Sequence, residues 1–489
     1  MSRFAFFAVL AGLACHAPEG STDARPTPGT TPNSTDTPPV ETDTETGTDT
    51  NPDVDPLTGA AFADCTTEAP WWRDEGTLTA VFVDPAASPN AVCNDGSPGL
   101  YYVRPGDSNW LIYLDGGSQC NNHGNCLARW CDVGDSYDHT DMSSEGAPTH
   151  NDLGGLFSEV EANPFSTWTH VYIHYCSSDL WTGAASDAAT LVDTGDAGDT
   201  TDYAIRFNGH DIVHAVFDEL LAPTRRSELA TLPPAADMQR ILFAGGSAGG
   251  LGVIWNGDSV ATRIRSVAPT ADVRLGVVAG IAMGLQGATD PWGPIAAPEA
   301  FVLSIQGMYG LGTTAADVFS KAKYDGFLDE SCQAAHPDDG WWCADAVHVL
   351  SHQVETPFFV AQDQLDPVWF TSLDTIIDGH DGPDNGLMTS AFQEEATRDL
   401  VTSFASIEDP ATPSAYLDGG VPVGWYMPRC AEHDGYGRNN DLFLGYDVDT
   451  SNGPPDVASF AALLAAWTAD AAPTRGLTSP SDLPDCSAP

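Results

Sequence analysis

The feature that most constrains this chain is an alternation of short apolar runs with segments of helical periodicity. Strands that alternate with helices in this way predict a mainly parallel sheet covered by helices on both faces. Active sites of such sheets lie at the carboxyl ends of the strands, so chemistry is expected just after each apolar run. The apolar runs are "WLIYLDGG" (110–117), "THVYIHYC" (169–176), "RILFAGG" (240–246) and "PFFVAQ" (357–362), and the helical segments are "GHDIVHAVFDELLA" (209–222) and "DVASFAALLAAWTADA" (456–471).

The amino-terminal part of the chain differs from the rest. Residues 1–14 carry one arginine and a short apolar core, which predicts a secretory signal. Cys15 follows "GLA" and resembles the lipidation site of a bacterial cell-surface lipoprotein; Gly12 replaces the usual leucine, so ordinary secretion is the alternative. Residues 15–58 are rich in Thr, Pro and Asp, which predicts a disordered linker. Residues 59–489 are then expected to form a single domain, and a membrane is expected to be contacted only through a lipid at Cys15.

The charge of the chain excludes some classes of partner. A formal charge of −51 arises from 69 acidic and 18 basic residues. Binding to nucleic acid needs clustered Lys and Arg, so nucleic acid is not an expected partner, and an anionic membrane surface is disfavoured for the same reason. So acidic a surface suits high salt or an acidic setting, where screening or protonation relieves its self-repulsion.

The cysteines agree with export. Of the eleven cysteines, those other than Cys15 are even in number, which in an exported chain predicts disulfides whose pairing the sequence leaves open. The segment "CNNHGNCLARWC" (120–131), with His123 inside it, could be drawn as a zinc site, but its spacing fits no familiar zinc pattern. We therefore expect no metal. The cysteines expected in disulfides are Cys65, Cys93, Cys120, Cys126, Cys131, Cys176, Cys332, Cys343, Cys430 and Cys486.

A serine follows one of the apolar runs in a setting typical of a nucleophile. In "FAGGSAGG", Ser247 has Gly245 two residues before it and Gly249 two residues after it, which is the G-x-S-x-G pattern of a nucleophile elbow. Such a serine is exposed on a tight turn between a strand and a helix, where only small neighbours fit. A glycine-rich turn without catalytic role is the alternative.

An activated serine also needs a histidine base and a carboxylate that orients it. In folds of this class the chain order is Ser, then Asp or Glu, then His. The residues that complete this order are Asp363, Asp366 and Asp374 as the acid and His380 and His433 as the base. The acids all lie at or soon after the end of the apolar run at 357–362, and the residues alone do not choose among them.

Longer motifs carry a resemblance to a known family. In chain order, and over most of residues 62–440, the motifs resemble those of the pectin acetylesterase and Notum family of carboxylesterases. The resemblance implies an α/β fold, an α/β-hydrolase-like three-layer sandwich with a mainly parallel central sheet, and ester hydrolysis by a Ser-Asp-His triad without a cofactor. The motifs are "LDGGSQCNN…CLAR" (114–129), "NPFSTWTHVYIHYCSSDLWTG" (163–183), "FAGGSAGGLGV" (243–253), "WWC" (341–343) and "CAEH" (430–433).

The resemblance also assigns roles to residues. Ser247 matches the family's nucleophile and His433 its base, whereas Asp366 matches its acid, with Asp363 as the alternative. The oxyanion hole matches the backbone N–H groups of Gly117, Ser118 and Ala248.

The chain departs from the family in the loop that should hold the oxyanion. The family usually has three glycines and a tryptophan before its cysteine, whereas this chain has Gly116, Gly117, Ser118 and Gln119 before Cys120. The N–H group survives at Ser118 because every non-proline residue supplies one. A polar Gln119 in the substrate pocket favours a small acyl group such as acetyl over a long fatty chain.

The expected substrate is therefore an acetylated polysaccharide or another acyl ester, hydrolysed by a monomeric exported enzyme. Pectin is itself a polyanion, and so acidic a domain should repel it unless salt screens the charge. The alternatives are a deacylase that acts on a lipid-modified protein or a thioester, and a surface lipoprotein that binds carbohydrate without turnover.

Overall fold

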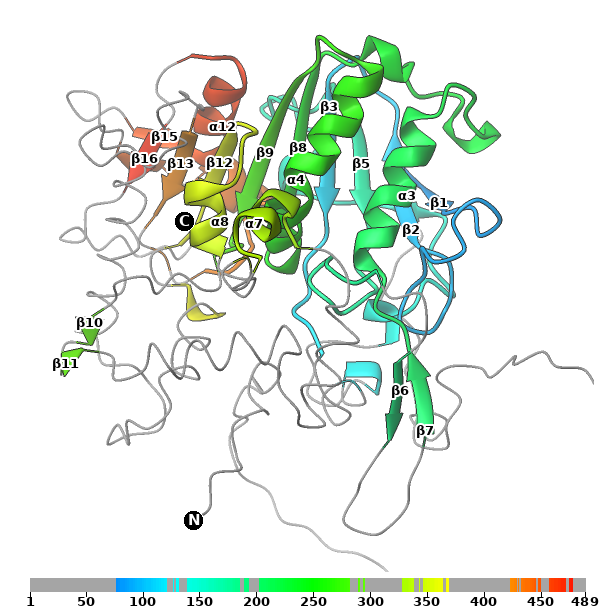
Figure 1. Ribbon diagram of the computed structural model, residues 1–489. Helices are drawn as coiled ribbons and strands as arrows, with labels where there is room; N and C mark the ends of the chain where they lie inside the picture. Colours follow the sequence, from blue (N-terminus) through cyan, green and yellow to red (C-terminus); the bar gives the residue numbers. More distant parts are fainter. Residues whose placement is uncertain are drawn as a thin grey trace, which may run out of the picture.

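The structure is a computed structural model, and its central feature is a large twisted sheet with helices packed on it (Figure 1). The signal at 1–14, Cys15, the linker at 15–58, Cys65, His123, Asp374, His380 and Cys486 lie outside the described residues. The described residues are 76–120, 126, 129–131, 139–184, 189–192, 202–281, 289–290, 293–294, 328–337, 343, 346–363, 366–368, 423–428, 430, 432–445, 447–449, 457–471 and 475–477.

The sheet that the structure describes has ten strands in the order β16-β13-β12-β9-β8-β3-β5-β2-β1-β4. The seven strands from β16 to β5 run parallel to their neighbours, and β2, β1 and β4 add an antiparallel edge. The strands are β1 (Leu78–Phe82), β2 (Leu100–Arg104), β3 (Trp110–Leu114), β4 (His150–Asn151), β5 (Thr169–Ile173), β8 (Arg240–Gly246), β9 (Asp272–Val278), β12 (Phe358–Ala361), β13 (Val423–Met427) and β16 (Arg475–Leu477).

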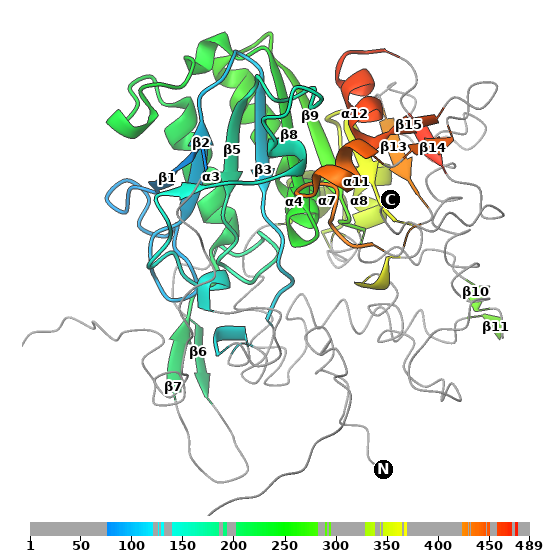
Figure 2. The same ribbon diagram turned by 180° about the vertical axis from the view of Figure 1, so that it is seen from behind.

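Helices cover both faces of this sheet, which makes three layers. Figure 1 shows α3, α4 and α8 in front of the strands, and Figure 2 shows α11 and α12 on the opposite face. The helices are α3 (Gly209–Leu221), α4 (Ala248–Val267), α7 (Glu330–Ala335), α8 (Ala346–His352), α11 (Asn440–Gly445) and α12 (Phe460–Thr468). Short pairs and turns complete the described elements: β6 (Ala189–Val192) with β7 (Asp202–Ile205), β10 (Thr289–Asp290) with β11 (Gly293–Pro294), β14 (Asp447–Asp449) with β15 (Val457–Ser459), and the 3-10 turns η1 (His139–Asp141), η2 (Gly155–Phe157), η3 (Ser227–Leu229) and η4 (Ala235–Asp237).

Two hydrophobic clusters fill the space between these layers. In β8, Ile241 and Phe243 belong to the cluster under α3, α4 and α8, whereas Leu242 and Ala244 belong to the cluster under α11 and α12. This alternation follows from the period of two in a strand, and a strand buried on both faces is therefore apolar at every position. The predicted α/β sandwich with a mainly parallel central sheet is confirmed.

The predicted elements are found with small differences at their ends. The apolar runs form β3, β5, β8 and β12, and the first helical segment forms α3. The prediction of the second helical segment, 456–471, was wrong at its start. Val457–Ser459 form the strand β15, which pairs with β14, and the helix α12 begins only at Phe460. Ser459 is the N-cap of α12, where its hydroxyl accepts a hydrogen bond from the N–H of Ala462. None of the helices that the structure describes is long and apolar enough to span a membrane.

Disulfides link several loops of the sheet. The pairs are Cys93–Cys176, Cys120–Cys126 and Cys332–Cys343, and Cys131 and Cys430 are also disulfide-bonded. The expectation of disulfides is confirmed for these residues, and zinc ligation by Cys120 and Cys126 is excluded because their sulfur atoms are bonded to each other.

Candidate active site

Ser247 occupies the turn between β8 and α4. Its backbone has φ 53° and ψ −119°, a region that non-glycine residues seldom adopt and that is concentrated at functional sites. The N–H of Ser247 donates to the carbonyl of Val278 at 2.9 Å, which ties the turn to the end of β9. The side chain is therefore held at the carboxyl ends of the parallel strands, where the fold predicts an active site.

The glycines on either side of Ser247 are required by close packing. A Cβ at Gly245 would lie 2.3 Å from the carbonyl oxygen of Gly249, and a Cβ at Gly249 would lie 2.0 Å from the carbonyl oxygen of Leu114. No larger residue fits at either position without movement of the backbone. The G-x-S-x-G spacing therefore brings α4 against β3 and presents the serine between them.

Two side chains from other loops form a chain of hydrogen bonds that ends at Ser247. His433 Nε2 lies 2.8 Å from Ser247 Oγ, and His433 Nδ1 lies 2.8 Å from Asp366 Oδ2. His433 follows β13 and Asp366 follows β12, so residues far apart in the chain meet at one edge of the sheet. Asp366 is 1% exposed, and it also accepts hydrogen bonds from Gln362 Nε2 at 2.7 Å and from the N–H of Val368 at 2.8 Å.

The alternative acid lies in a different environment. Asp363 is completely buried, and its Oδ1 accepts a hydrogen bond from the hydroxyl of Tyr436 at 2.7 Å. Burial raises the pKa of Asp363 well above its ordinary value, which disfavours the charged carboxylate that a triad acid must supply. Among the described residues, the carboxylate that contacts His433 is that of Asp366.

The surroundings of His433 favour a proton on the ring. Burial alone lowers its pKa, but the hydrogen bond and the negative charge of Asp366, with a contribution from Asp434, outweigh burial and raise the pKa above 6.5. A raised pKa strengthens the imidazole as a proton acceptor. The neutral ring then needs a pH above that raised value.

An ionic cluster of buried carboxylates and one exposed arginine lies beside the serine and the histidine. Arg438 contacts Asp115 Oδ1 at 3.2 Å and Asp434 Oδ2 at 3.0 Å, and the hydroxyl of Tyr113 donates to Asp434 at 3.3 Å. A Cβ at Gly246 would lie 1.8 Å from Asp434 Oδ1, so the carboxylate packs directly against the serine turn. Arg438 thus joins the loop after β3 to the loop that carries His433. The sequence analysis did not predict this cluster. The one local signal for it in the sequence is Asp434, the acidic residue directly after His433.

The loop after β3 runs beside Ser247. A Cβ at Gly116 would lie 3.0 Å from Cβ of Ser247, which places the following residues, Gly117 and Ser118, next to the serine. No described residue accepts a hydrogen bond from the N–H of Ser118 or of Ala248. As far as the described residues go, these groups remain available to donate to a ligand, and Ala248 also begins α4, whose N-terminus favours negative charge.

Ser118 and Gln119 are held by Tyr175 and by the loop that follows it, Ser177–Gly183. The backbone of Gln119 pairs with Asp179, and the carbonyl of Ser118 accepts a hydrogen bond from the hydroxyl of Tyr175 at 2.9 Å. Gln119 is 7% exposed. Asp179 is completely buried and accepts four hydrogen bonds, from the hydroxyl of Ser177 and from the N–H groups of Trp181, Gly183 and Gly209.

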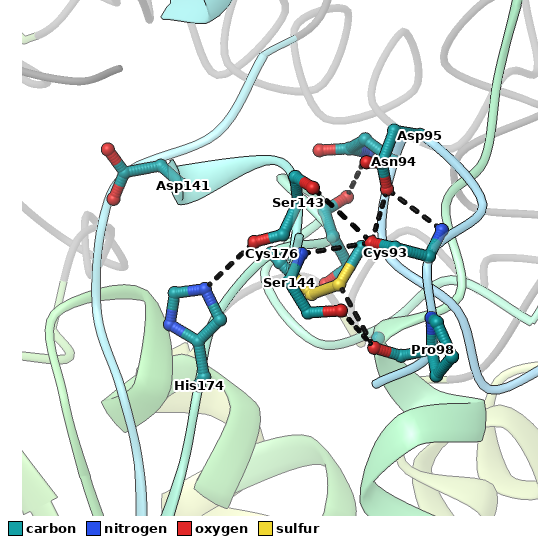
Figure 3. Close-up of a disulfide and its surroundings, with 12 residues drawn as sticks. Cys93, Asn94, Asp95, Pro98, Asp141, Ser143, Ser144, His174 and Cys176 are labelled. Atoms are coloured by element: carbon teal, nitrogen blue, oxygen red, sulfur yellow. Dashed lines mark hydrogen bonds between the residues drawn. A yellow bond between two sulfur atoms is a disulfide. The ribbon is translucent and has the colours of Figure 1, made fainter. Parts of the chain in front are cut away.

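The Ser177–Gly183 loop is strained and anchored. Ser178, Leu180 and Trp181 all have positive φ, at 50°, 57° and 64°. The disulfide of Cys176 with Cys93 anchors the start of this loop, and Figure 3 shows Asn94, Ser144 and His174 around it. Asn94 donates to the carbonyl of Ser177 and accepts from the hydroxyl of Ser178 at 2.7 Å. Strain of this kind persists only where the surroundings hold it, as the disulfide and Asn94 do here.

The described part of the chain contains no set of side chains arranged as metal ligands. No group of three or more His, Cys, Asp or Glu side chains among the described residues is arranged to hold a metal ion. An alcohol, an imidazole and a carboxylate joined by hydrogen bonds, with backbone N–H groups nearby, are the groups that acyl transfer requires.

Comparison with known proteins agrees with this chemistry. The Pectinacetylesterase family profile matches residues 73–385. Palmitoleoyl-protein carboxylesterase NOTUM from Homo sapiens is 34% identical over 191 residues, which are 38% of this chain and 33% of that protein. The protein of the same name from Drosophila melanogaster is 30% identical over 283 residues, 56% of this chain and 36% of its own length. The chain thus spans about a third of the length of these relatives.

The fold has a solved counterpart. A structure of the Wnt deacylase Notum from Drosophila superposes with a TM-score of 0.58 at 23% identity, and the match covers 84% of this chain and 98% of that one. The two share an α/β-hydrolase-like fold. Since the family profile covers more than half of the chain, the chain belongs to the pectinacetylesterase family.

Proposed function

We propose that the protein is a serine esterase that hydrolyses short acyl esters, above all acetyl esters, through Ser247, His433 and Asp366. The observation that carries the proposal is the continuous path of two 2.8 Å hydrogen bonds from Ser247 Oγ through the His433 ring to Asp366 Oδ2. The first bond joins the nucleophile to its base, and the second fixes which ring nitrogen holds the proton.

In the proposed mechanism His433 takes the proton of Ser247 as the oxygen attacks the ester carbonyl. Asp366 stabilises the imidazolium that forms, which agrees with the raised pKa of His433. His433 then gives the proton to the departing alcohol, and an acyl-enzyme is left on Ser247. Water repeats the two proton transfers to release the acid and restore the serine.

The oxyanion is proposed to accept hydrogen bonds from the N–H groups of Gly117, Ser118 and Ala248. Two observations support this: the loop after β3 packs against Ser247, and the N–H groups of Ser118 and Ala248 have no partner among the described residues. Donors that are already oriented act on charge that appears only in the transition state.

The proposed substrate is an acetylated polysaccharide outside the cell. Gln119, where the family usually has an aromatic residue, supports a small acyl group, and the family profile is that of pectinacetylesterases. Disulfides such as Cys93–Cys176 support export of the protein, because they are typical of oxidising compartments. An exported enzyme in turn fits a polymeric substrate outside the cell. We further propose that a lipid on Cys15 holds the enzyme at a bacterial surface.

The formal charge of −51 makes a neutral polysaccharide a better fit than pectin. If the charge matters, added salt lowers KM for pectin more than KM for a neutral ester such as p-nitrophenyl acetate. Equal responses of the two KM values would remove this argument against pectin.

A second candidate is removal of a long acyl group from a protein. It is favoured by the 34% identity with a human protein named a palmitoleoyl-protein carboxylesterase. The two candidates differ in the acyl group, so turnover of p-nitrophenyl acetate and p-nitrophenyl octanoate separates them. A preference for acetate supports the first and a preference for octanoate the second.

The test is acetate release from acetylated pectin, xylan and a neutral acetylated glucan by the full chain and by Ser247→Ala. Ser266→Ala is the matched control, because Ser266 is exposed in the last turn of the same helix, α4. We expect release by the wild type and the control, and a loss of roughly 10⁶-fold in Ser247→Ala. Release that survives in a folded Ser247→Ala would refute the assignment, and binding without release by the wild type would indicate a carbohydrate-binding protein.

A further inference from the structure

Arg129 is a buried arginine that contacts the loop beside Ser247. It is 5% exposed, and its Nη1 donates to the carbonyl oxygen of Gly117 at 2.6 Å. Its guanidinium also lies over the ring of Tyr175, 5.9 Å from the centroid, and donates to the carbonyl of Asp141 at 3.4 Å. Cys126, three residues earlier, is bonded to Cys120, so a disulfide ties the segment of Arg129 to the loop that Arg129 contacts.

The contact with Gly117 acts on one particular N–H group. The carbonyl of Gly117 and the N–H of Ser118 are the two ends of one planar peptide group and point in opposite directions. A charged donor on the oxygen draws electron density from the nitrogen, which makes the N–H a stronger donor, and hydrogen bonds in such chains strengthen each other. A guanidinium on the carbonyl side therefore both orients and polarises the N–H on the other side.

The backbone at this point needs such support. Gly117 has φ 145° and Ser118 has φ 58°, so two successive residues lie in regions that L-residues rarely adopt. The next peptide group is held as well, since the hydroxyl of Tyr175 donates to the carbonyl of Ser118 and accepts from the N–H of Leu180. Arg129 and Tyr175 thus hold two consecutive carbonyls of the loop.

We propose that Arg129 is a positioning residue for ester hydrolysis, which strengthens and orients the Ser118 N–H as a donor to the oxyanion through the carbonyl of Gly117. The inference rests on the proposed function, in which Ser118 is part of the oxyanion hole. Negative charge on the substrate oxygen exists only in the transition state, so Arg129 acts on kcat and leaves KM unchanged. In a chain with a formal charge of −51, a fixed cation next to the forming oxyanion also offsets repulsion from the acidic surface.

Arg274 supplies a matched control. It is also 5% exposed, its guanidinium lies 5.1 Å from the centroid of the Trp467 ring, and it donates to the carbonyl of Trp467. It differs in location, since it lies in the first half of β9, away from the carboxyl ends of the strands. Its loss should affect stability without a selective effect on the transition state.

The experiment compares Arg129→Gln, Arg129→Lys and Arg274→Gln with the wild-type full chain. The measurements are kcat and KM for p-nitrophenyl acetate, the Ki of a trifluoromethyl ketone that forms an ionised hemiketal with the serine, and the melting temperature. We expect Arg129→Gln to lower kcat about ten- to hundredfold and to raise Ki by the same factor, with KM within about twofold. Arg129→Lys keeps the charge and should retain most of the activity, and Arg274→Gln should lower only the melting temperature.

Unchanged kcat and Ki in a folded Arg129→Gln would overturn the proposal, as would a fall in kcat without a parallel rise in Ki. If Arg129→Gln does not fold, Arg129→Lys decides: kcat close to that of the wild type supports the role of the charge, and a folded Arg129→Lys with unchanged Ki but reduced kcat contradicts it. Activity retained by Ser247→Ala would instead refute the proposed function, whatever the Arg129 variants do.

Discussion

Two regions flank Ser247 and differ in how they are built. On the base side, hydrogen bonds between side chains join the serine to His433 and through it to Asp366. On the oxyanion side, the serine lies beside the backbone of the loop at residues 115–120. The base side works through the chemical identity of its residues. In the proposed mechanism, the oxyanion side works through the position of N–H groups, which every residue except proline supplies. Its buried supports, such as Arg129 and Tyr175, therefore carry the specific contacts.

This difference predicts which substitutions the site tolerates. Ser118 and Gln119 differ from the family's usual residues, yet Ser118 keeps its N–H group and its unusual φ of 58°. A change at His433 or Asp366 would instead remove the atoms that move or stabilise the proton. We therefore expect the largest effects on the base side and graded effects on the oxyanion side.

After replacement of Ser247 itself, the largest effect is expected from Asp366→Asn. An amide cannot stabilise the imidazolium and favours the wrong ring tautomer, so kcat should fall about 10⁴-fold. Asp363→Asn is the control in the same loop, because Asp363 contacts Tyr436 instead of His433, and an amide oxygen can still accept the hydrogen bond of Tyr436. Steady-state kinetics on p-nitrophenyl acetate distinguish the two variants. Equal losses would show that the base side does not depend on the Asp366 charge.

The next effect concerns the anchor of the oxyanion side. Replacing both Cys93 and Cys176 by serine removes a link between residues 83 positions apart and should lower the free energy of unfolding by about 2–5 kcal/mol. The same change at Cys332 and Cys343, only 11 positions apart, should cost less, because a shorter loop restricts the unfolded chain less. Urea unfolding measures both. A larger cost for the short loop would contradict the account.

The pH dependence sharpens the description of the base side. His433 must be neutral to accept a proton, and its pKa is raised above 6.5, so kcat/KM should fall tenfold per pH unit once the pH drops below that raised value. In Asp366→Asn the residual activity should extend to lower pH, since burial alone lowers the pKa of His433. Profiles of kcat/KM against pH for both proteins test this. An inflection at the same pH in both profiles would show that Asp366 does not set the pKa of His433.

The smallest effect is expected from Tyr175→Phe. The lost hydroxyl donates to the carbonyl of Ser118 and accepts from Leu180, and one net hydrogen bond of about 1 kcal/mol corresponds to a fall in kcat of about fivefold. Tyr101→Phe is the control, since its hydroxyl bonds Glu219 on α3 instead of the loop beside Ser247. It should lower stability and leave kcat unchanged. Equal kcat in the wild type, Tyr175→Phe and Tyr101→Phe would mean that Tyr175 does not position the loop beside Ser247.

The sequence predicts the parts of the molecule that depend on local pattern. The apolar runs predict β3, β5, β8 and β12, because strands buried on both faces are apolar throughout. The G-x-S-x-G spacing predicts the turn at Ser247, because its flanking glycines meet backbone atoms at distances that exclude a Cβ. The antiparallel edge of β1, β2 and β4 was not predicted, since pairing at an edge depends on distant partners.

The candidate site shows the same division. From residue order alone His380 and His433 both fitted, and the choice of His433 came from a longer motif; the structure joins His433 to Ser247 and Asp366, while His380 lies outside the described residues. Arg129 and Arg438 were missed because their partners are carbonyls or carboxylates of distant loops, which no local spacing reveals.

The measurement that tests the central claim most directly is covalent labelling with a fluorophosphonate, read by peptide mass spectrometry. The reagent reacts with a serine only when a base activates it and an oxyanion hole accepts the charge. The account predicts one label per chain, on Ser247, that is lost in His433→Ala while Ser266→Ala labels normally. A label on another residue, or an esterase that is active but takes up no label on Ser247, would contradict the account.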